Sequence, residues 1–275
     1  MHIFSSSGIA IKELFAHKTR TFLASLGILI GIASVIVMVA IGKGSQMEVM
    51  DVIAGMGENL ITINAGEMKR RGGRLRLSGN VTTLTVRDAN RIIDEISEVE
   101  RVAPFEEKRM AAKFSNSSVE TTIAGSTIDF RFIRNYELKN GEFFSEIDVK
   151  TANRVAIIGM TVVKNLFGEE DPVGQVIRVH FIPFKIIGVF EPKGVDTNGL
   201  DQDDLVLIPL STYMRRIVNQ TFVSRIFVQA SSRKNIPKAS EKIRELLRES
   251  HKLTDERNDD FTLISQLDIE ELKKE

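Results

Sequence analysis

The apolar run Thr21–Gly42 constrains this chain more than any other stretch, because an ordinary water-soluble domain does not contain it. It carries no charge and no polar group beyond Thr and Ser. A helix over these residues covers roughly 33 Å, and a hydrocarbon core measures roughly 30 Å. Backbone groups in lipid must be satisfied within the segment, so a helix is expected. The alternatives are a cleaved signal peptide, whose apolar region is usually about 7–15 residues long, and a buried core helix. We predict a retained transmembrane helix over residues 21–42.

The charges beside this run predict its orientation. The preceding segment has Lys12, Lys18 and Arg20 against Glu13, and the following segment has Lys43 against Glu48, Asp51 and Glu58. Because cytoplasmic flanks are enriched in Lys and Arg, residues 1–20 are predicted to be cytoplasmic. The basic stretch 69–76 favours the opposite orientation but lies beyond the usual counting distance. Residues 43–275 are therefore predicted to lie outside the cytoplasm, behind a single span of the inner (plasma) membrane.

The composition describes an ordinary folded domain behind this helix. Hydrophobic residues make up 43% and charged residues 27% of the chain, as in globular proteins. Basic and acidic residues both number 37, so the net charge gives no case for nucleic-acid binding. The absence of cysteine excludes disulfides, thiolate metal sites and cysteine nucleophiles.

Small residues within the apolar run form a possible packing face. Gly27 and Gly31 make a G-x-x-x-G pair, and Ser34 follows one turn later. Such spacing lets another helix approach closely, although Gly is common in membrane helices anyway. Residues 43–58 are predicted to extend the helix, and Gly55 and Gly57 supply its stop signal. Residues 1–20 form either a short interfacial helix or simply the start of the membrane helix.

The region after residue 58 predicts an α+β fold. A strand at 59–64 precedes a helix that begins with a capping box of Thr85 and Asp88, followed by the apolar stripe Ala89, Ile92, Ile93 and Ile96. Strands at 99–106 and 109–114, with a turn between them, complete a first half. A strand at 224–230, a helix at 236–253 and a strand at 261–264 form a second half. The two halves fit a split βαββαβ unit.

The remaining segments fill in the predicted organisation. The basic, glycine-rich stretch 66–79 is predicted to be a solvated loop. It is not predicted to bind nucleic acid, because no aromatic residue is interleaved for base stacking. The middle of the chain alternates with period two and is rich in predicted strands. We therefore expect residues 59–117 and 222–267 to form the split unit, residues 118–221 to be a strand-rich insertion, and residues 268–275 to lead onward.

A search for chemistry finds no catalytic, cofactor-binding or metal motif. The sequence lacks the phosphate-binding loops, the H-E-x-x-H motif and the G-x-S-x-G nucleophile turn. Its histidines, His2, His17, His180 and His251, are far apart in the sequence. The acidic stretch Asp201–Asp204 favours a solvated loop or a junction between subdomains over a calcium site, since the alternating oxygens and later Glu are missing. We predict a protein without enzymatic activity of its own and without a cofactor.

Several stretches, in this order, resemble the permease subunit of MacB-like ABC transporters, within the FtsX/LolC-type superfamily. The matching stretches are Lys18–Val35, Ile41–Ser45, Gly57–Ile61, Asn140–Ser145, Asn165–Gln175, Phe184–Val189 and Asp201–Pro209. The resemblance spans nearly the whole chain and does not identify a substrate. It implies a first transmembrane helix followed by a periplasmic core domain, with a porter-like part and an inserted, strand-rich part called sabre.

The same resemblance implies function and partners. Such permeases transmit ATP-driven motion to their periplasmic domains to export small molecules or lipoprotein or peptide cargo. The implied partners are an ABC ATPase subunit or domain, a second permease copy or paired permease, a periplasmic adaptor and membrane lipid, without nucleic acid. Family members have four membrane helices, so residues 268–275 are expected to lead into a second membrane helix, and this chain is expected to be a fragment or a truncated form. The alternatives are a single-span anchored interaction or regulatory protein and an anchored hydrolase with an unrecognised site.

Overall fold

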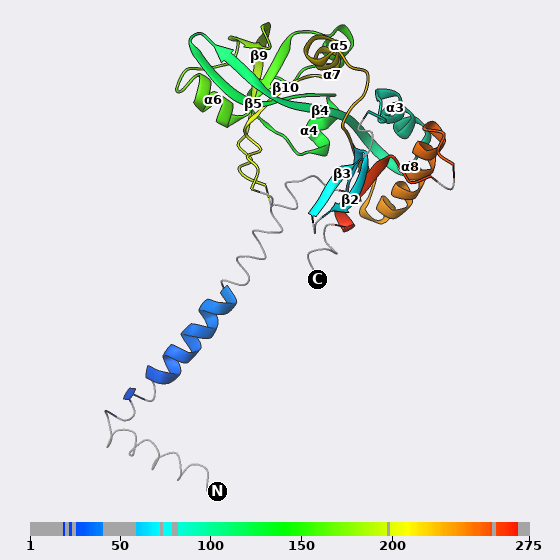
Figure 1. Ribbon diagram of the computed structural model, residues 1–275. Coiled ribbons are helices and arrows are strands. Elements are labelled where there is room, and N and C mark those ends of the chain that lie inside the picture. The colour runs from blue at the N-terminus through cyan, green and yellow to red at the C-terminus, as the bar shows by residue number, and fades with distance from the viewer. Residues whose placement is uncertain are drawn as a thin grey trace. The chain divides into compact units, whose positions relative to one another are not determined.

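The computed structural model describes residues 19, 22–23, 26–40, 59–71, 74–78, 82–196, 199–254 and 257–268. The chain divides into a part of residues 1–52 and a part of residues 53–275, and each is described by itself (Figure 1). In the first part, residues 26–40 form a helix whose large apolar side chains are exposed. No helix within the described residues is long and apolar enough to cross a membrane. The extension predicted at 43–58 lies outside the described residues, and of the segments 1–20 and 268–275 only residues 19 and 268 lie within them.

The second part is a mixed α+β structure, as predicted, and it is built on one ten-stranded sheet. Its strands run in the order β12-β1-β11-β4-β5-β10-β7-β9-β6, and β8 pairs with β4 and β9. The bounds are β1 Leu60–Ala65, β4 Val99–Phe114, β5 Ser117–Ser126, β6 Leu138–Gly141, β7 Val155–Ile158, β8 Val176–Val179, β9 Ile182–Phe190, β10 Leu205–Pro209, β11 Arg225–Ala230 and β12 Phe261–Ser265.

Helices connect these strands. They are α3 Val86–Glu95, α4 Asp129–Ile133, α5 Glu146–Thr151, α6 Met160–Leu166, α7 Leu210–Thr212, the π-helix η1 Tyr213–Val218, the 3-10 turn η2 Arg233–Asn235 and α8 Ile236–Ser250. A separate two-stranded sheet consists of β2 Glu67–Arg71 and β3 Arg74–Ser78.

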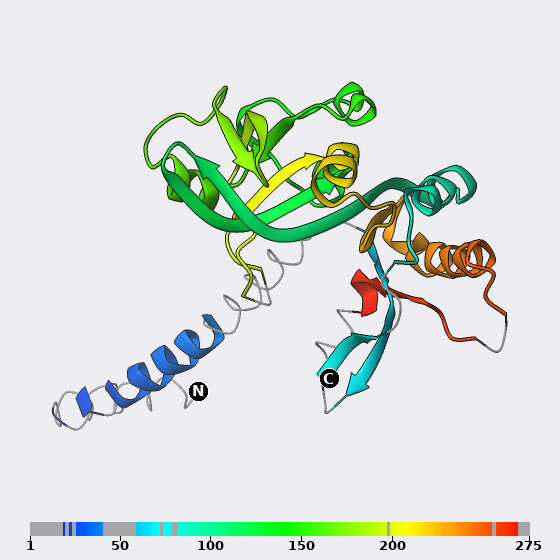
Figure 2. The same cartoon turned by 45° about the horizontal axis from the view of Figure 1, so that its top comes forward.

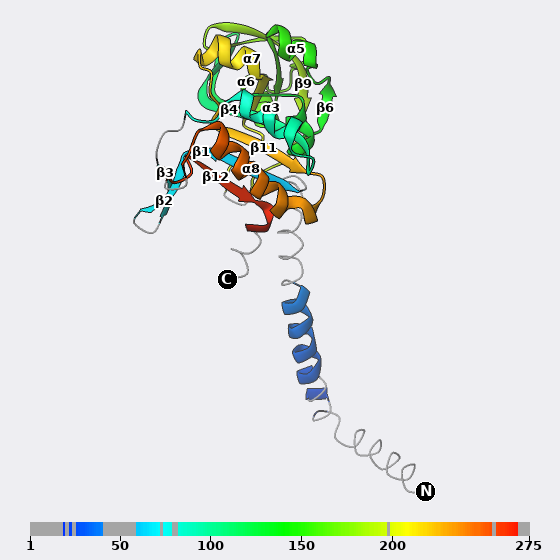
Figure 3. The same ribbon diagram turned by 90° about the vertical axis from the view of Figure 1, so that its right-hand side faces the viewer.

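The four-stranded region consists of β12, β1, β11 and residues 99–105 of β4, with helices α3 and α8. All of its strand pairs are antiparallel. Figure 3 shows α3 and α8 lying over the strands of this region. The apolar stripes of both helices supply its core, because residues three or four apart share one helix face. Buried members include Ile61, Ile92, Ile226, Ile243 and Leu247.

Local sequence signals explain how α3 begins and which face it buries. The side chain of Thr85 accepts a bond from the backbone N–H of Asp88, and Asp88 accepts in turn from the N–H of Thr85. The predicted capping box is thus present. Ala89, Ile92 and Ile96 are buried, whereas Ile93 is 38% exposed at the edge of the stripe.

The strand-rich region consists of residues 106–114 of β4 with strands β5 to β10. Its central strand β10 is buried at all five positions. Val206 and Ile208 face one apolar cluster, and Leu205 and Leu207 face another on the opposite side of the sheet. Since successive strand residues point to opposite faces, this continuous apolar run is a strand covered on both sides.

Strand β4 corrects one prediction. It continues through residues 99–114 without the turn expected after residue 106. Its partner changes instead: residues up to Phe105 pair with β11, and residues from Glu106 onward pair with β5. Figure 2 shows this strand sweeping from one region to the other. The polar run 106–109 resembles a turn in the sequence, but exposed strand positions are polar too.

The stretch 66–79 corrects another prediction, because it contains the hairpin β2–β3 rather than a loop. The register pairs Arg71 with Arg74, so only two residues separate the strands. Those residues are Gly72 and Gly73, a strong short-range hairpin signal, and Leu75 and Leu77 alternate with arginines in the second strand. The many basic residues of this stretch are typical of a solvated loop, although they alternate with leucines at period two in the second strand.

Candidate functional site

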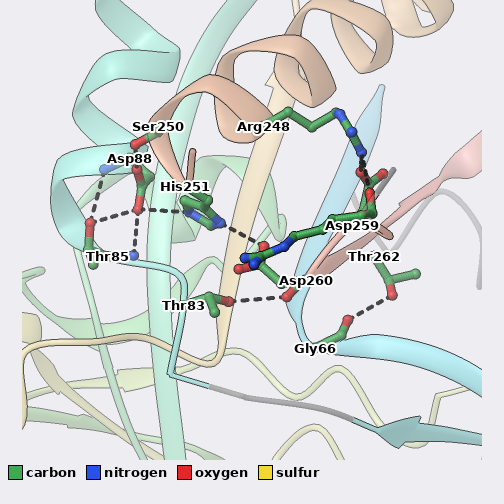
Figure 4. A network of polar contacts seen from close by, with 11 residues as sticks. Gly66, Thr83, Thr85, Asp88, Arg248, Ser250, His251, Asp259, Asp260 and Thr262 are labelled. Atoms are coloured by element: carbon green, nitrogen blue, oxygen red, sulfur yellow. Dashed lines mark hydrogen bonds and ion pairs between the residues drawn. The ribbon is translucent and has the colours of Figure 1, made fainter. Parts of the chain in front are cut away.

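A polar network around His251 joins three elements of the four-stranded region (Figure 4). His251 follows α8 directly, and its Nδ1 lies 2.7 Å from Oδ1 of Asp260, which precedes β12. Its Nε2 lies 3.6 Å from Oδ2 of Asp88 on α3. The imidazole therefore lies between two carboxylates that come from opposite ends of the sequence of this region.

Asp88 is the buried centre of this network. Its Oδ2 accepts from the backbone N–H of Thr85 at 2.9 Å and from the Thr85 hydroxyl at 2.7 Å. Its Oδ1 accepts from the hydroxyl of Ser250 at 2.6 Å. One carboxylate thus caps α3 and also holds the end of α8 against it.

The protonation of the pair follows from these contacts. Burial raises the pKa of Asp88, but the ion-pair contact with His251 and the hydrogen bonds from Ser250 and Thr85 outweigh it and hold this pKa well below its usual range. The same contact with Asp88 raises the pKa of His251 against the opposing effect of burial, and Asp260 raises it further. Both ring nitrogens face carboxylates, so the imidazole is suited to hold α3, α8 and β12 together rather than to act as a base on a substrate.

Further polar contacts extend the network along the same edge. Arg248 pairs with Asp259, next to Asp260. The hydroxyl of Thr83 donates to the carbonyl of Asp260 at 3.1 Å, and the hydroxyl of Thr262 donates to the carbonyl of Gly66 at 2.9 Å. The beginning of β12 is therefore fixed by side chains from both sides.

A second anchor of α8 lies at Glu98, just before β4. The ammonium groups of Lys238 and Lys242 each lie 2.7 Å from its carboxylate. Their hydrogen bonds lower the pKa of Glu98 to about 2. Lysines one turn apart on α8 thus converge on one carboxylate at the start of the long strand.

Polar contacts also flank the point where β4 passes between the two regions. The carboxylate of Glu106 accepts from the backbone N–H of Ser224, just before β11. Arg225 lies 3.5 Å from Glu107, and the hydroxyl of Ser126 donates to the carbonyl of Pro104 at 2.9 Å. The crossing is therefore held from β11 on one side and β5 on the other.

The residues predicted to form a membrane packing face are Gly27, Gly31 and Ser34. All three are exposed on the helix of residues 26–40, and a Cβ built on either glycine meets no atom within 4 Å. The hydroxyl of Ser34 donates to the carbonyl of Ile30 at 2.8 Å, as Ser often does inside helices. Their role in packing stays a prediction.

The acidic stretch Asp201–Asp204 holds a loop in place. Asp203 is buried, and its carboxylate accepts from the backbone N–H groups of Lys193 and Gly194 at 2.8 and 3.0 Å. Asp201 accepts from the hydroxyl of Thr161 at 2.7 Å, and Asp204 pairs with Arg109 at 3.0 Å. No group of three or more His, Asp or Glu residues that could hold a metal occurs in the described part of the chain.

The His251 network was not predicted from the sequence. A sequence pattern identifies a histidine as a site residue only when a possible metal ligand follows at a regular spacing. The partners of His251 lie nine residues ahead and 163 residues behind it. Asp88 carried a signal only for its capping role. No sequence pattern reports that a cap also accepts a bond from the end of a distant helix.

Comparisons with known proteins identify the family to which the chain is similar. The model of the MacB-like periplasmic core domain matches residues 21–246. The chain is 33% identical over 263 residues to a macrolide export ATP-binding/permease protein MacB of Chlorobium luteolum, covering 96% of this chain and 39% of the relative. A Shewanella protein of the same description is 37% identical over 248 residues, covering 90% and 37%. The chain thus spans about two fifths of the length of these relatives.

Two solved structures share the fold. The periplasmic region of MacB from Actinobacillus actinomycetemcomitans superposes with a TM-score of 0.67 at 24% identity, covering 81% of this chain and 95% of that one. The extracellular domain of the noncanonic ABC-type transporter YknZ from Gram-positive bacteria gives a TM-score of 0.61 at 17% identity, covering 75% and 100%.

Proposed function

Because the chain belongs to the MacB-like periplasmic core domain family, we propose that it is the N-terminal portion of an ABC transporter permease subunit. In this role it transmits ATP-driven motion to an extracytoplasmic domain for the export of small molecules or of lipoprotein or peptide cargo. A partner ATPase subunit or domain hydrolyses the ATP. The chain itself binds and moves, and it catalyses no reaction.

The observation that carries this proposal is the continuity of β4. One strand, Val99–Phe114, is hydrogen-bonded to β11 in the four-stranded region and to β5 in the strand-rich region. A ladder of backbone hydrogen bonds resists stretching and shear more than a flexible linker does. This continuity supports the proposal that a displacement applied to one region is passed to the other.

We propose that the chain contains the two parts known in this family. Residues 59–117 and 222–267 form the porter-like part, which is supported by the antiparallel order β12-β1-β11-β4 and the helices α3 and α8. Residues 118–221 form the inserted, sabre-like part. The insertion begins at the β4–β5 turn, and its return into β11 lies beside the crossing of β4, where Glu106 and Glu107 contact Ser224 and Arg225.

We propose that residues 21–42 span the inner membrane with the N-terminus in the cytoplasm. The uncharged run and the basic residues before it support this arrangement. The cysteine-free sequence makes the test direct. Cysteine introduced for exposed Asn116, in the β4–β5 turn, should react with an impermeant maleimide in intact cells, whereas cysteine introduced for Ser6 should react only after lysis. The reverse labelling pattern would overturn the orientation.

We further propose that Gly27, Gly31 and Ser34 form the face on which a second permease helix packs. Replacing both glycines by Leu should abolish cross-linking between copies through a cysteine at Ser34, because the bulky side chains keep the backbones apart. Leu at Ala33 and Val37, also on this helix, is the matched control. Equal cross-linking in both variants would remove these glycines from the interface.

The decisive test of the proposed function is isolation of the tagged native protein from its own membranes. We expect an ABC ATPase to co-purify, together with vanadate-sensitive ATP hydrolysis, and we expect a periplasmic adaptor among the bound proteins. A preparation with no ATPase and no ATP hydrolysis would instead favour an anchored interaction protein.

A flexible Gly-Ser insertion between Phe105 and Glu106 should preserve ATP hydrolysis and abolish export, because it interrupts β4.

A further inference from the structure

A groove of about 590 Å³ is lined by residues of β4, β11, α4 and the segment that leads from α4 into β6. This volume is within the range of ligand-binding pockets. The residues used below are half-buried or exposed, so a partner can reach them. They are Glu100, Arg101, Arg131, Phe132, Glu137 and Leu138, which all line the groove.

Cations and aromatic rings are stacked in this groove. The guanidinium of Arg101, on β4, lies 4.6 Å from the centroid of the Phe132 ring, and that of Arg131, on α4, lies 4.4 Å from the same centroid. Arg131 also lies over the ring of Phe143, at 5.4 Å. Contacts of this kind hold long side chains in one conformation. Binding a partner then costs less side-chain entropy.

Phe132 is the exposed apolar group of the groove. Its side chain is 46% exposed although two guanidinium groups lie over the ring. Helix α4 is fixed in this orientation, because Phe130 and Ile133 are buried in the core beneath it. An accessible aromatic ring held beside arginines has the composition typical of protein–protein interfaces.

Arg131 supplies a cation that lacks an anion. Among the described residues it forms no ion pair, whereas Arg101 pairs with Glu100 at 3.2 Å. Stacking on a ring uses the flat face of a guanidinium and leaves the N–H groups along its edge for hydrogen bonds. Those N–H groups match the two oxygens of a carboxylate.

The segment that leads into β6 contributes the opposite charge and an open sheet edge. Glu137 is exposed and forms no ion pair in the described part of the chain. The next residue, Leu138, begins β6, which is the last strand of the sheet and pairs with β9 alone among the described strands. Figure 3 shows β6 at the outer edge of the strand-rich region. An edge strand offers backbone groups to an extended segment of another protein.

We propose that this groove binds an extended segment of a partner protein in which an apolar side chain lies between an acidic and a basic residue. The carboxylate of the segment pairs with Arg131, the apolar side chain packs against the exposed ring of Phe132, and the basic side chain pairs with Glu137. The backbone of the segment runs beside the start of β6. The proposal rests on this groove alone and is independent of the transport function.

The test is selection from a random decapeptide library displayed on phage, with the whole chain held in lipid nanodiscs as the target. Clones that bind empty nanodiscs are removed first. We expect the selected peptides to share an apolar residue flanked by an acidic and a basic one, and the synthetic peptide to bind saturably in calorimetry. Selected peptides without this shared pattern, or no selection above the empty nanodiscs, would overturn the proposal.

Variants assign the contacts. Arg131→Gln should weaken binding of the selected peptide about tenfold to a hundredfold, because the charge-assisted bonds are lost. Arg131→Lys should restore only part of it, since Lys keeps the charge without the planar fork. Replacing the acidic residue of the peptide by its amide should weaken binding to the native chain equally, and should have no further effect on Arg131→Gln.

Arg178→Gln, exposed on β8 and outside the groove, is the matched control and should bind the peptide as the native chain does. Phe132→Ser should weaken binding severalfold, and it serves as the second variant if unfolding curves show that Arg131→Gln does not fold. Binding unchanged in the folded variants of Arg131 and Phe132 would refute the site.

Discussion

At the scale of single residues, His251 shows how one side chain serves several elements. Its ring nitrogens face Asp260 before β12 and Asp88 on α3, and the hydroxyl of Ser250, at the end of α8, bonds the same Asp88. The ring of Phe261 meets the imidazole edge-on at 5.9 Å. Asp88 and Asp260 are the titratable groups that face it directly, while Arg248 and Asp259 pair beside it. A protonated imidazole is thus paired on both sides.

The first prediction concerns pH. Because the folded pKa of His251 is raised, its contribution to stability is fully present below the unfolded pKa of about 6.5 and is lost as pH rises through the folded pKa. His251→Gln should lower the free energy of unfolding by about 1–3 kcal/mol at pH 6 and by less at pH 9. Denaturant unfolding of the whole chain across this range is the measurement. His180→Gln, in the exposed β8–β9 turn, is the control and should leave the pH profile unchanged. A constant deficit of His251→Gln at every pH would contradict the paired imidazolium.

At the scale of elements, the junction between β7 and α6 depends on a close backbone approach. Gly159 is the N-cap of α6, and a Cβ built there would lie 2.2 Å from the carbonyl oxygen of Asp203. The Gly159 N–H also donates to the carbonyl of Leu205 at 2.8 Å. The strand-to-helix turn and the acidic loop before β10 are therefore packed backbone to backbone, which only glycine permits.

The second prediction separates this steric requirement from backbone conformation. Gly159→Ala should lower the free energy of unfolding by about 1–3 kcal/mol, because the Asp203 carbonyl must move. Gly168→Ala is the control: this residue has a φ of +62° but open space around its Cβ position, so about 1 kcal/mol is expected from strain alone. Hydrogen exchange of the amide of residue 159, which donates to the Leu205 carbonyl, should rise in the first variant and not in the second. If both variants cost the same and leave this amide protected, the close approach does not limit stability.

At the scale of the whole extracytoplasmic part, β4 makes the two regions share one sheet. Its first seven residues face the core under α3 and α8 through Val99 and Val102. Its last residues contribute Ala112 to a core of the strand-rich region. Because the same backbone serves both ladders, loss of packing in one region is expected to weaken the other.

The third prediction tests this coupling. Ile92→Ala empties a fully buried position under α3 and should cost about 2–5 kcal/mol. Hydrogen exchange should then speed up in β9 of the strand-rich region as well as in β1. Ile147→Ala on α5, where the side chain is 68% exposed, should change neither strand. Faster exchange confined to β1 would mean that the regions unfold independently and that β4 does not couple them.

Features that depend on near neighbours along the chain could be predicted from the sequence. The period of the apolar residues predicted the α3 stripe and most strands of the sheet, and Thr85 and Asp88 predicted the cap, because helix faces and caps involve residues three or four apart. Ordered motifs also predicted the family. The Gly72-Gly73 hairpin signal was available too, although the basic composition around it favoured a loop.

Features that depend on residues far apart in the sequence emerged only from the folded chain. Strand β4 continues where a turn was predicted, since the pairing that carries its polar residues 106–109 comes from β5. His251 acquires its role from Asp88, and Glu98 is paired with Lys238 and Lys242. Charge pairing and burial act through space, so a buried cation and a solvated one look alike in the sequence.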